Sequence, residues 1–432
     1  MKEDLSSIKP LRGFRELTPE EFGRKTLVIS KAEELFRLYG YEEVEIPTLE
    51  PLKLIELKVG DEIRHRMFRF KDLSGREVVL RPEGTISIAR LMATRLKAAP
   101  LPARLSYIGN MFRYDEPQRG RFREHTQIGF ELFGSGSMLA DLEVLEISVR
   151  LLRDLGFKEY HFKIGHEGIL RRIMDDFGIK VDKQDALLGM MDRKEWDSVR
   201  SELKQQGKAE LLGLLEKMSS LKGSDQGSIF EKARKSLKEI PGIQTLLDDF
   251  KKMVDFLHDI TGGLVIVDLG FARGLEYYTG MIFEVYVKGL EIAVAGGGRY
   301  DGLCKLFGLD IPAVGFALGV DRLILGDEAP KTPKQPFVSL IPVTETVHEY
   351  AFQVGGELRR TGIPVITEFP TKSLSSTMEK VSKKEARFAV IIGDKEASTK
   401  TVTIKDMKSG EQELCTLDVA IQKIGERVQK GS

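Results

Sequence analysis

Arginines gather in one short stretch of this chain. Residues 90–123 hold eight Lys or Arg and two acids. Four of these arginines belong to one predicted loop: Arg113, Arg119, Arg121 and Arg123. A guanidinium presents paired N–H donors that match phosphate oxygens, so a polyphosphate or a nucleic-acid backbone is the natural partner. A solvated charged face is the alternative, but few acids compensate these arginines.

A further arginine follows an apolar run at residues 264–269 that is typical of a buried strand. Arg273 stands there, close to the adjacent tyrosines Tyr277 and Tyr278. Tyrosine pairs on strands usually only pack, one on each face. An arginine at the end of an apolar strand is harder to dismiss, because its burial requires an anionic partner.

Two polar pairs are placed to line a cavity. Glu83 and Thr85 lie at a predicted strand-to-helix junction, where helix capping is the economical explanation and a ligand wall is the other. Gln127 and Glu131 are four residues apart on a predicted strand, so period-two alternation puts both on one face. Their neighbours Ile128, Phe130 and Leu132 are apolar, which indicates that the polar pair faces a cavity.

A glycine-rich stretch, residues 296–302, follows a predicted strand at residues 291–295. It lacks the lysine and the spacing of a Walker A loop and the spacing of a dinucleotide fingerprint. Two interpretations remain open: a hairpin turn that uses glycine for positive φ, or bare backbone that lets a planar ligand approach.

The elements that must position these residues alternate along the chain. A capping box of Thr18 and Glu21 with Pro19 predicts a helix over residues 18–39. Strands are predicted at residues 41–47, within 63–81, over the two arms of 103–134, and at 160–164, 264–269, 281–287 and 291–295. Further helices are predicted at 84–96, 140–155 and 315–325, and residues 167–259 are helical and charged. Beyond a proline-rich stretch, alternating strands and helices predict a small, partly parallel α/β domain.

The composition excludes several classes of protein to which the chain could belong. The 432 residues include 66 Lys plus Arg and 66 Asp plus Glu, so the chain is not a globally basic nucleic-acid coat. Two cysteines, Cys304 and Cys415, and scattered histidines predict no metal site made of protein ligands. No apolar run is long enough to cross a membrane and the N-terminus has no signal-peptide pattern, so we expect a cytoplasmic protein.

Together these stretches resemble the motifs of class II aminoacyl-tRNA synthetases, specifically the histidyl-tRNA synthetase family. Pro47 ends a stretch similar to motif 1, residues 112–134 resemble motif 2 and residues 313–322 resemble motif 3. The segments 81–85, 271–278 and 297–302 resemble the elements diagnostic for histidine. These matches occur in the family's order and cover nearly the whole chain.

The resemblance implies an α+β protein with a six-stranded antiparallel catalytic sheet flanked by helices. It implies catalytic segments at 1–166 and 261–326, a helical insertion at 167–260, a linker at 327–336 and an α/β anticodon-binding domain at 337–432. It also implies a homodimer. The reaction would be ATP-dependent activation of L-histidine to histidyl-adenylate with release of pyrophosphate, with Mg²⁺ accompanying ATP. Histidine would then pass to the 3' end of tRNA(His), giving AMP.

Roles for individual residues follow from the resemblance alone. Arg113 and Arg273 would be catalytic and meet the ATP α-phosphate, and Arg121 and Arg322 would meet the outer phosphates. The adenine would be read by Asp115, where the family usually has glutamate, or by its neighbour Glu116. The histidine-binding set would be Glu83, Gly84, Thr85, Arg113, Gln127, Glu131, Arg273, Tyr277 and Tyr278. Within this set, Glu131 and the two tyrosines would line the imidazole pocket. Gln118 and Arg123 would meet the tRNA acceptor end.

Two alternatives remain within the same resemblance. The regulatory subunit of ATP phosphoribosyltransferase is a paralogue that binds histidine without ligating it, but it typically lacks an anticodon domain and erodes the ATP-binding arginines. This chain keeps Arg113, Arg121, Arg273 and Arg322. A synthetase for threonine, proline or glycine is the other alternative, and threonine would predict zinc ligands that the cysteine and histidine spacing does not offer.

Overall fold

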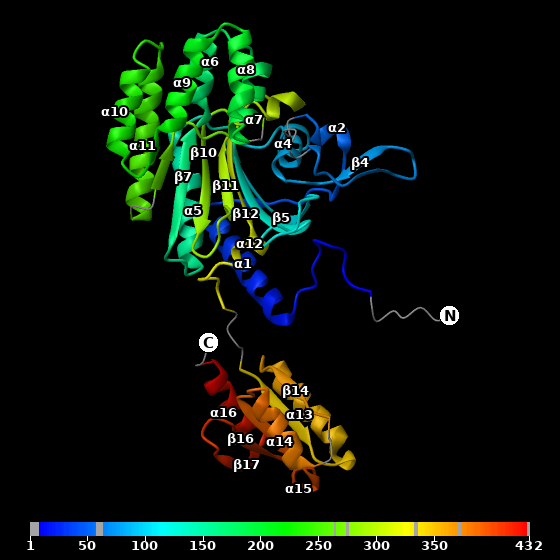
Figure 1. Cartoon of the computed structure of the whole chain (residues 1–432). Coiled ribbons are helices and arrows are strands. Elements are labelled where there is room, and N and C mark those ends of the chain that lie inside the picture. The colour runs from blue at the N-terminus through cyan, green and yellow to red at the C-terminus, as the bar shows by residue number, and fades with distance from the viewer. Residues whose placement is uncertain are drawn as a thin grey trace. The chain divides into compact units, whose positions relative to one another are not determined.

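The computed structural model describes residues 8–57, 64–262, 265–273, 276–331, 336–369 and 373–429. The chain forms two compact units, residues 1–332 and 333–432 (Figure 1). Predicted strand residues at Ile63 and Leu264 and part of the predicted linker, residues 332–335, lie outside the described residues. In the described part of the chain, no helix is long and apolar enough to cross a membrane.

Helix α1 (Pro19–Leu38) begins as the sequence predicts. Thr18 N donates to Glu21 Oε2 at 2.8 Å and Thr18 Oγ1 accepts from Glu21 N at 3.4 Å, which completes the capping box. The helix buries one face, and Phe36 packs edge-on against Phe130 with ring centroids 5.0 Å apart. Burial of this apolar face fixes the helix on the central sheet.

The six-stranded antiparallel sheet is confirmed as the centre of unit 1. Its strands, in spatial order, are β5 (Ala103–Phe112), β6 (Glu124–Phe133), β12 (Ala313–Gly319), β11 (Ala295–Arg299), β10 (Met281–Val287) and β7 (Tyr160–His166). Three short strands extend it within the described residues. These are β1 (Glu42–Glu43), parallel to β5, then β9 (Val265–Asp268), parallel to β7, and β8 (Lys222–Gly223), antiparallel to β9.

The two faces of this sheet are covered differently. Helices α1, α5 (Met138–Asp154) and α11 (Ile243–Thr261) pack on one face, in a core that includes Phe130, Phe162, Phe283 and Phe316. The other face carries α4 (Thr85–Thr94) and a second core around Tyr107 and Tyr300. A small sheet lies beside α4 and α2 (Leu52–Ile55), with strand order β2 (Leu49–Pro51), β4 (Glu77–Leu80) and β3 (Arg69–Lys71).

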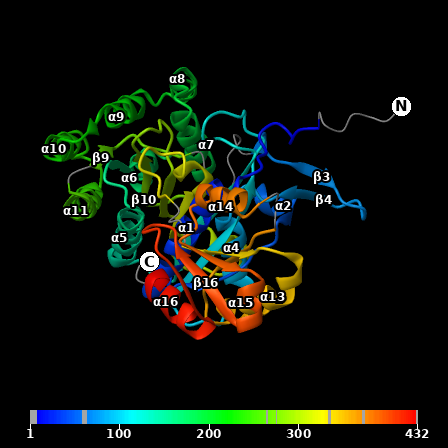
Figure 2. The same cartoon turned by 90° about the horizontal axis from the view of Figure 1, so that it is seen from below.

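The predicted helical module is also present. It comprises α6 (Glu167–Asp176), α7 (Val181–Asp192), α8 (Trp196–Gln205), α9 (Ala209–Ser220), α10 (Gln226–Ser236) and α11. Each helix turns an apolar stripe inward, as Leu187, Leu203 and Leu215 illustrate. Figures 1 and 2 show α8–α11 on one side of unit 1, while the β3–β4 hairpin projects from the opposite side.

Three predicted elements are wrong. The strand predicted at 291–295 lies instead at β11, so Gly296–Gly298 form a strand and not a turn. The helix predicted at 315–325 is strand β12 up to Gly319, followed by the short helix α12 (Val320–Leu323). Glycines lack the side chains that reveal alternation, which hides both strands. The strand predicted at 41–47 shrinks to the two residues of β1.

Unit 2 has the predicted alternation of strands and helices. Its sheet has the order β14 (Val365–Thr367), β13 (Val338–Pro342), β15 (Phe388–Ile392), β16 (Thr401–Asp406) and β17 (Gln412–Thr416), with the first three parallel and the last two antiparallel. Its helices are α13 (His348–Arg360), α14 (Leu374–Lys383), α15 (Asp394–Thr399) and α16 (Leu417–Gln429). An apolar core of its own, including Val338, Leu358 and Val390, holds this unit together.

Candidate active site

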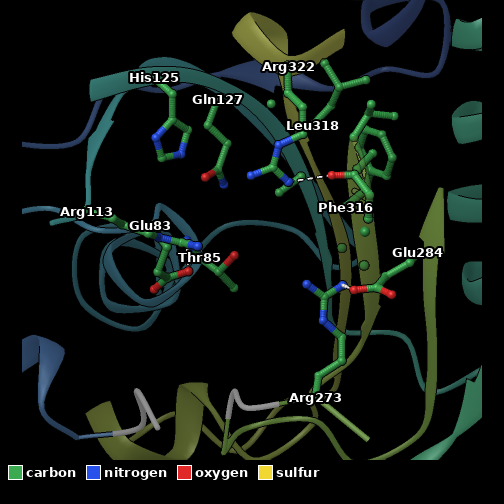
Figure 3. A pocket seen from close by; sticks show the side chains of 18 of the residues that line it. Glu83, Thr85, Arg113, His125, Gln127, Arg273, Glu284, Phe316, Leu318 and Arg322 are labelled. Carbon is green, nitrogen blue, oxygen red and sulfur yellow. Dashed lines mark hydrogen bonds and ion pairs between the residues drawn. The ribbon is translucent and has the colours of Figure 1, made fainter. Parts of the chain in front are cut away.

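A deep pocket opens on the face of the unit 1 sheet opposite α5. It encloses about 1000 Å³, including the solvent at its mouth, and is lined by strands β6, β10, β11 and β12 and by the start of α4 (Figure 3). Ten of the predicted site residues line it: Glu83, Thr85, Arg113, Asp115, Gln127, Glu131, Arg273, Tyr277, Tyr278 and Arg322. The fold therefore brings most of the predicted constellation together.

Glu83 fits both interpretations of the sequence, because it caps the start of a helix and also lines the pocket wall. Its carboxylate accepts from the backbone N–H groups of Thr85 and Ile86 at 2.9 and 3.0 Å, which caps α4. Burial raises the pKa of Glu83, against the lowering effect of these bonds and of Arg113. Arg113 is held beside it, because its Nε donates to the carbonyl of Pro82 at 2.8 Å. Figure 3 shows Glu83, Thr85 and Arg113 grouped on one wall.

Glu131 lies at the floor of the pocket and is 1% exposed. Thr85 Oγ1 donates to Oε1 at 2.8 Å, and the hydroxyl of Tyr300 donates to Oε2. Burial raises the pKa of Glu131 to about 8, although both hydroxyl bonds act to lower it. Two hydroxyls thus hold a buried carboxylate in one orientation, with acceptor capacity left for a ligand N–H.

Aromatic rings enclose the same floor. The rings of Tyr277 and Tyr278 lie 4.9 Å apart, and Tyr300 meets Tyr277 edge-on at 5.6 Å. Gln127 Nε2 donates to the hydroxyl of Tyr107 at 2.7 Å, which fixes the amide of Gln127 toward the pocket. These contacts enclose the floor beside Glu131 with aromatic rings.

Arg273 reaches the pocket from the segment that follows β9. Its Nη1 donates to the carbonyl of Phe283 at 3.3 Å and lies 3.8 Å from Glu284 Oε1. The guanidinium runs along the bare backbone of Gly296, where a Cβ would lie 2.1 Å from Nη1. Burial acts to lower the pKa of Arg273, but Glu284 and the two tyrosine hydroxyls outweigh it and the pKa is raised.

Arg322 stands at the opposite end of the pocket. Its Nε donates to the carbonyl of Gly120 at 2.9 Å, and Nη1 donates to the carbonyl of Ala293. Burial, followed by repulsion from Arg113 and Arg121, lowers the pKa of Arg322 to about 10. Several cations thus converge on one space, which favours a ligand with several negative charges.

Asp115, and not its neighbour, lines the pocket. Its side chain is 12% exposed and lies 3.3 Å from Arg66 Nη1. Glu116 is 70% exposed and pairs with Arg12 at the surface. The geometry therefore favours Asp115 for contact with a pocket ligand.

Four predicted site residues do not line the pocket: Gly84, Gln118, Arg121 and Arg123. Gly84 lies behind it, where a Cβ would meet the ring of Tyr107 at 2.3 Å. Gln118 and Arg121 face each other across the tip of the β5–β6 loop. The guanidinium of Arg123 lies 3.6 Å from the ring centre of Tyr114, and its Nε donates to the carbonyl of Asp115.

Several pocket residues escaped the sequence prediction. The main ones are His125, Glu284, Tyr300 and Phe316. Tyr300 belongs to the 297–302 segment, and the motif in that segment is a usable signal for it. Burial, with repulsion from Arg113 and Arg322, lowers the pKa of His125 to about 3 and keeps it neutral. Nothing in the local pattern around His125 or Glu284 distinguishes it from an ordinary strand residue.

The carboxylates and histidines of the described ranges do not form a metal cluster. No group of three or more His, Cys, Asp or Glu side chains there is arranged to hold a metal ion. Two pocket carboxylates, Asp115 and Glu284, instead face arginines.

Six antiparallel strands with arginines converging from the β5–β6 loop and from the helix after β12 define the catalytic domain of a class II aminoacyl-tRNA synthetase. The family model for histidyl-tRNA synthetase matches residues 13–323, and that of an anticodon binding domain matches residues 338–427. The chain belongs to the histidyl-tRNA synthetase family.

Curated relatives agree with this assignment, and solved structures share the fold. A histidine–tRNA ligase of Methanocaldococcus jannaschii is 35% identical over 94% of this chain and 97% of its own, and one of Sulfurisphaera tokodaii is 36% identical over 94% and 96%. The histidyl-tRNA synthetase of Nostoc sp. PCC 7120 shares the fold with a TM-score of 0.75 at 22% identity, over 97% and 99% of the two chains. A structure from Bacillus halodurans C, described as an ATP phosphoribosyltransferase regulatory subunit/histidyl-tRNA synthetase, has a TM-score of 0.71 at 28% identity, over 87% and 96%.

Proposed function

We propose that the unit 1 pocket binds L-histidine and ATP side by side and joins them as histidyl-adenylate. The family makes the chain a histidine–tRNA ligase that uses ATP, and the roles of individual residues are our proposal. The observation that carries it is the buried carboxylate of Glu131, held by Thr85 and Tyr300 at the floor of a pocket whose walls carry arginines. Because the reaction serves protein synthesis, we propose that it takes place in the cytoplasm.

The floor suits an imidazole. Glu131 would accept a hydrogen bond from the imidazole N–H, and Tyr277 and Tyr278 would enclose the ring. A site built to pair with a substrate N–H rejects analogues without it by about 10⁴–10⁵, because the buried acceptor is then left unsatisfied. Glu83, Thr85 and Gln127 would hold the α-ammonium, with Gly84 needed behind them for the close packing of Tyr107.

The arginines suit a nucleoside triphosphate and its reaction. Arg113 would hold the α-phosphate, Arg121 and Arg322 the outer phosphates, and Asp115 the adenine. A carboxylate oxygen of histidine would attack the α-phosphorus in line, and the bond to pyrophosphate would break. Arg273, with Arg113, would stabilise the negative charge on the transferring group in the transition state. The 3' hydroxyl of tRNA would then attack the histidyl carbonyl carbon and release AMP.

Mg²⁺ would enter with ATP. Glu83 and Glu131 already accept two bonds each from the protein, and Asp115 is assigned to the adenine, so a carboxylate ligand from the pocket would be limited to Glu284. This donor set fits a metal held mainly by phosphate oxygens, with at most one carboxylate. The ion would neutralise charge on the outer phosphates as pyrophosphate leaves.

The remaining assignments concern tRNA and assembly. Residues 1–166 and 261–326 would form the catalytic domain, 167–260 the helical insertion, and 337–432, after the linker 327–336, the anticodon-binding domain for tRNA(His). Gln118 and Arg123, in the β5–β6 loop, would lie near the acceptor end. A homodimer would form through the segment that ends at Pro47, and sedimentation of the purified chain tests this.

ATP–pyrophosphate exchange with each of the twenty amino acids, supplied one at a time, tests the proposed function. Exchange with histidine alone is the expected result. Exchange with another amino acid would overturn the role of Glu131 and the tyrosines. Heat stabilisation by histidine without any exchange would support a regulatory, non-ligating protein instead.

A further inference from the structure

Helix α6 of the helical insertion begins without a loop where strand β7 of the catalytic sheet ends (Figure 1). Its first residue, Glu167, is 1% exposed. The backbone N–H of Glu167 donates to the carbonyl of Gly280 at 2.9 Å, and Oε1 accepts from the backbone N–H of Arg273 at 3.2 Å. One residue of the insertion thus contacts the arginine-bearing segment on both sides of Tyr277 and Tyr278.

Arg171, one helical turn further on, contacts the same segment. Its Nε donates to the carbonyl of Tyr278 at 3.1 Å, and Nη2 lies 3.3 Å from Glu167 Oε2. Gly168 allows this approach, because a Cβ there would lie 2.9 Å from the carbonyl of Thr279. The contacts reach backbone atoms of the segment, so they fix its position and not the chemistry of its side chains.

The remaining guanidinium nitrogen of Arg171, Nη1, bonds to the next helix, α7 (Val181–Asp192). Nη1 donates to Asp185 Oδ1 of α7 at 2.8 Å, and the two side chains are 15% and 11% exposed. A nearly buried charged pair of this kind holds its geometry, since a guanidinium has a fixed fork of donors. The position of α7 therefore sets the position of Arg171, which in turn holds the carbonyl of Tyr278.

We propose that Arg171 is a positioning residue for histidine activation, and that through it the helical insertion sets the placement of Arg273, Tyr277 and Tyr278. The inference rests on the proposed function of the pocket and adds to it a part of the chain that does not line the pocket. The insertion is then a structural component of the activation site, and a shift of α7 relative to α6 changes activity.

Arg171 and its neighbour Arg172 offer a matched pair of variants. Arg172 lies on the same helix, but its Nε donates to the carbonyl of Pro241, inside the insertion. Arg171→Met should lower kcat for histidine-dependent ATP–pyrophosphate exchange about 10–100-fold and raise KM for histidine about tenfold, because displacing reacting groups by about 1 Å costs on the order of 10²-fold. KM for ATP should change less than threefold, since Arg113 and Arg322 lie on other segments. Arg172→Met should leave all three parameters within twofold of the unchanged chain.

The split between the two KM values separates positioning from loss of folded protein, which would lower kcat and leave both KM values unchanged. Equal behaviour of Arg171→Met and Arg172→Met would overturn the inference. If Arg171→Met does not fold, Asp185→Asn decides: a rise in KM for histidine of about threefold or more supports the inference, and unchanged constants refute it. Absence of exchange in the unchanged chain would refute the proposed function itself, which keeps the two failures distinct.

Discussion

Glu131 lies directly across the backbone of Gly315 on the neighbouring strand. The two residues are opposite each other in the β6–β12 pair, and a Cβ on Gly315 would lie 1.6 Å from Glu131 Oε2. The same oxygen accepts from the hydroxyl of Tyr300. The buried carboxylate can thus reach its place only because residue 315 has no side chain.

Gly315→Ala should therefore damage histidine recognition. The added methyl must push the carboxylate of Glu131 away from Thr85 and Tyr300, and kcat/KM for histidine in pyrophosphate exchange should fall by about 10²-fold. Gly213→Ala, in α9, is the matched control, because a Cβ there also meets nothing within 4 Å. Adding Glu131→Asp, which is one methylene shorter, should recover part of the loss. An unchanged KM for histidine in Gly315→Ala would contradict the role of this contact.

The sequence predicted the placement of side chains that depends only on their own strand or helix. Gln127 and Glu131 could be assigned to one face because strand alternation is local, and the capping box of α1 is complete within four residues. Tyr300 is 169 positions from Glu131, and only the assembled sheet brings their oxygens together. The sequence predicted a turn at Gly296 and a helix at Gly315, and both predictions are wrong for a related reason. The two glycines leave space for Arg273 and Glu131, and a residue without a side chain gives no periodic signal.

The raised pKa of Glu131 predicts a pH dependence. Burial raises this pKa to about 8, and an imidazole N–H needs the carboxylate as acceptor. Because kcat/KM reports the free enzyme, kcat/KM for histidine should rise by about tenfold between pH 6.5 and 8. Glu131→Gln has no proton to lose and should be much less active, with a flat profile in that range. A flat profile in the unchanged chain would count against an ionised Glu131 as the imidazole acceptor.

The same pKa also affects stability without ligand. Because the folded-state pKa of about 8 exceeds the value of 4.5 for an ordinary glutamate, the stability linked to protonated Glu131 is fully present below pH 4.5 and is lost as pH rises through 8. Thermal unfolding of the Glu131→Gln variant and of the unchanged chain, compared at pH 6 and 8.5, isolates this group. The unfolding temperature of Glu131→Gln, relative to that of the unchanged chain, should be higher at pH 8.5 than at pH 6.

Arg273→Ala should separate chemistry from binding. In the proposed reaction the guanidinium stabilises charge that develops on the α-phosphate, and loss of one such donor typically costs about 10²–10³ in kcat. Histidine affinity, measured by calorimetry without ATP, should change only a few-fold, since Glu131, Glu83 and Gln127 remain. Glu284 keeps a donor in the variant, the hydroxyl of Tyr286 at 2.8 Å. Lys305→Ala, at an exposed ion pair with Asp310, is the control, and near-normal exchange in Arg273→Ala would remove Arg273 from the mechanism.

Unit 2 depends on the carboxylate of Asp406, which is 5% exposed. It accepts from the guanidinium groups of Arg387 and Arg427 and from the backbone N–H groups of Lys408 and Ser409. Burial alone would raise the pKa of Asp406, but these donors outweigh it and hold the pKa well below its usual range. The stability from this group is therefore present above about pH 3.8 and is lost as pH falls further.

Asp406→Asn should destabilise unit 2 by about 2–4 kcal/mol, because it leaves two guanidinium groups without their charged partner. The single tryptophan of the chain, Trp196, lies in α8 of unit 1, so its fluorescence reports that unit alone, while circular dichroism reports both. In the variant, the midpoint temperature of one unfolding transition seen by circular dichroism should fall. The midpoint of the fluorescence transition and the rate of pyrophosphate exchange should stay unchanged. Charging of tRNA(His) should fall with the loss of the anticodon-binding unit. Asp418→Asn, at an exposed position of α16, should alter none of these, and a parallel loss of exchange in Asp406→Asn would show that unit 1 depends on unit 2 for its own fold.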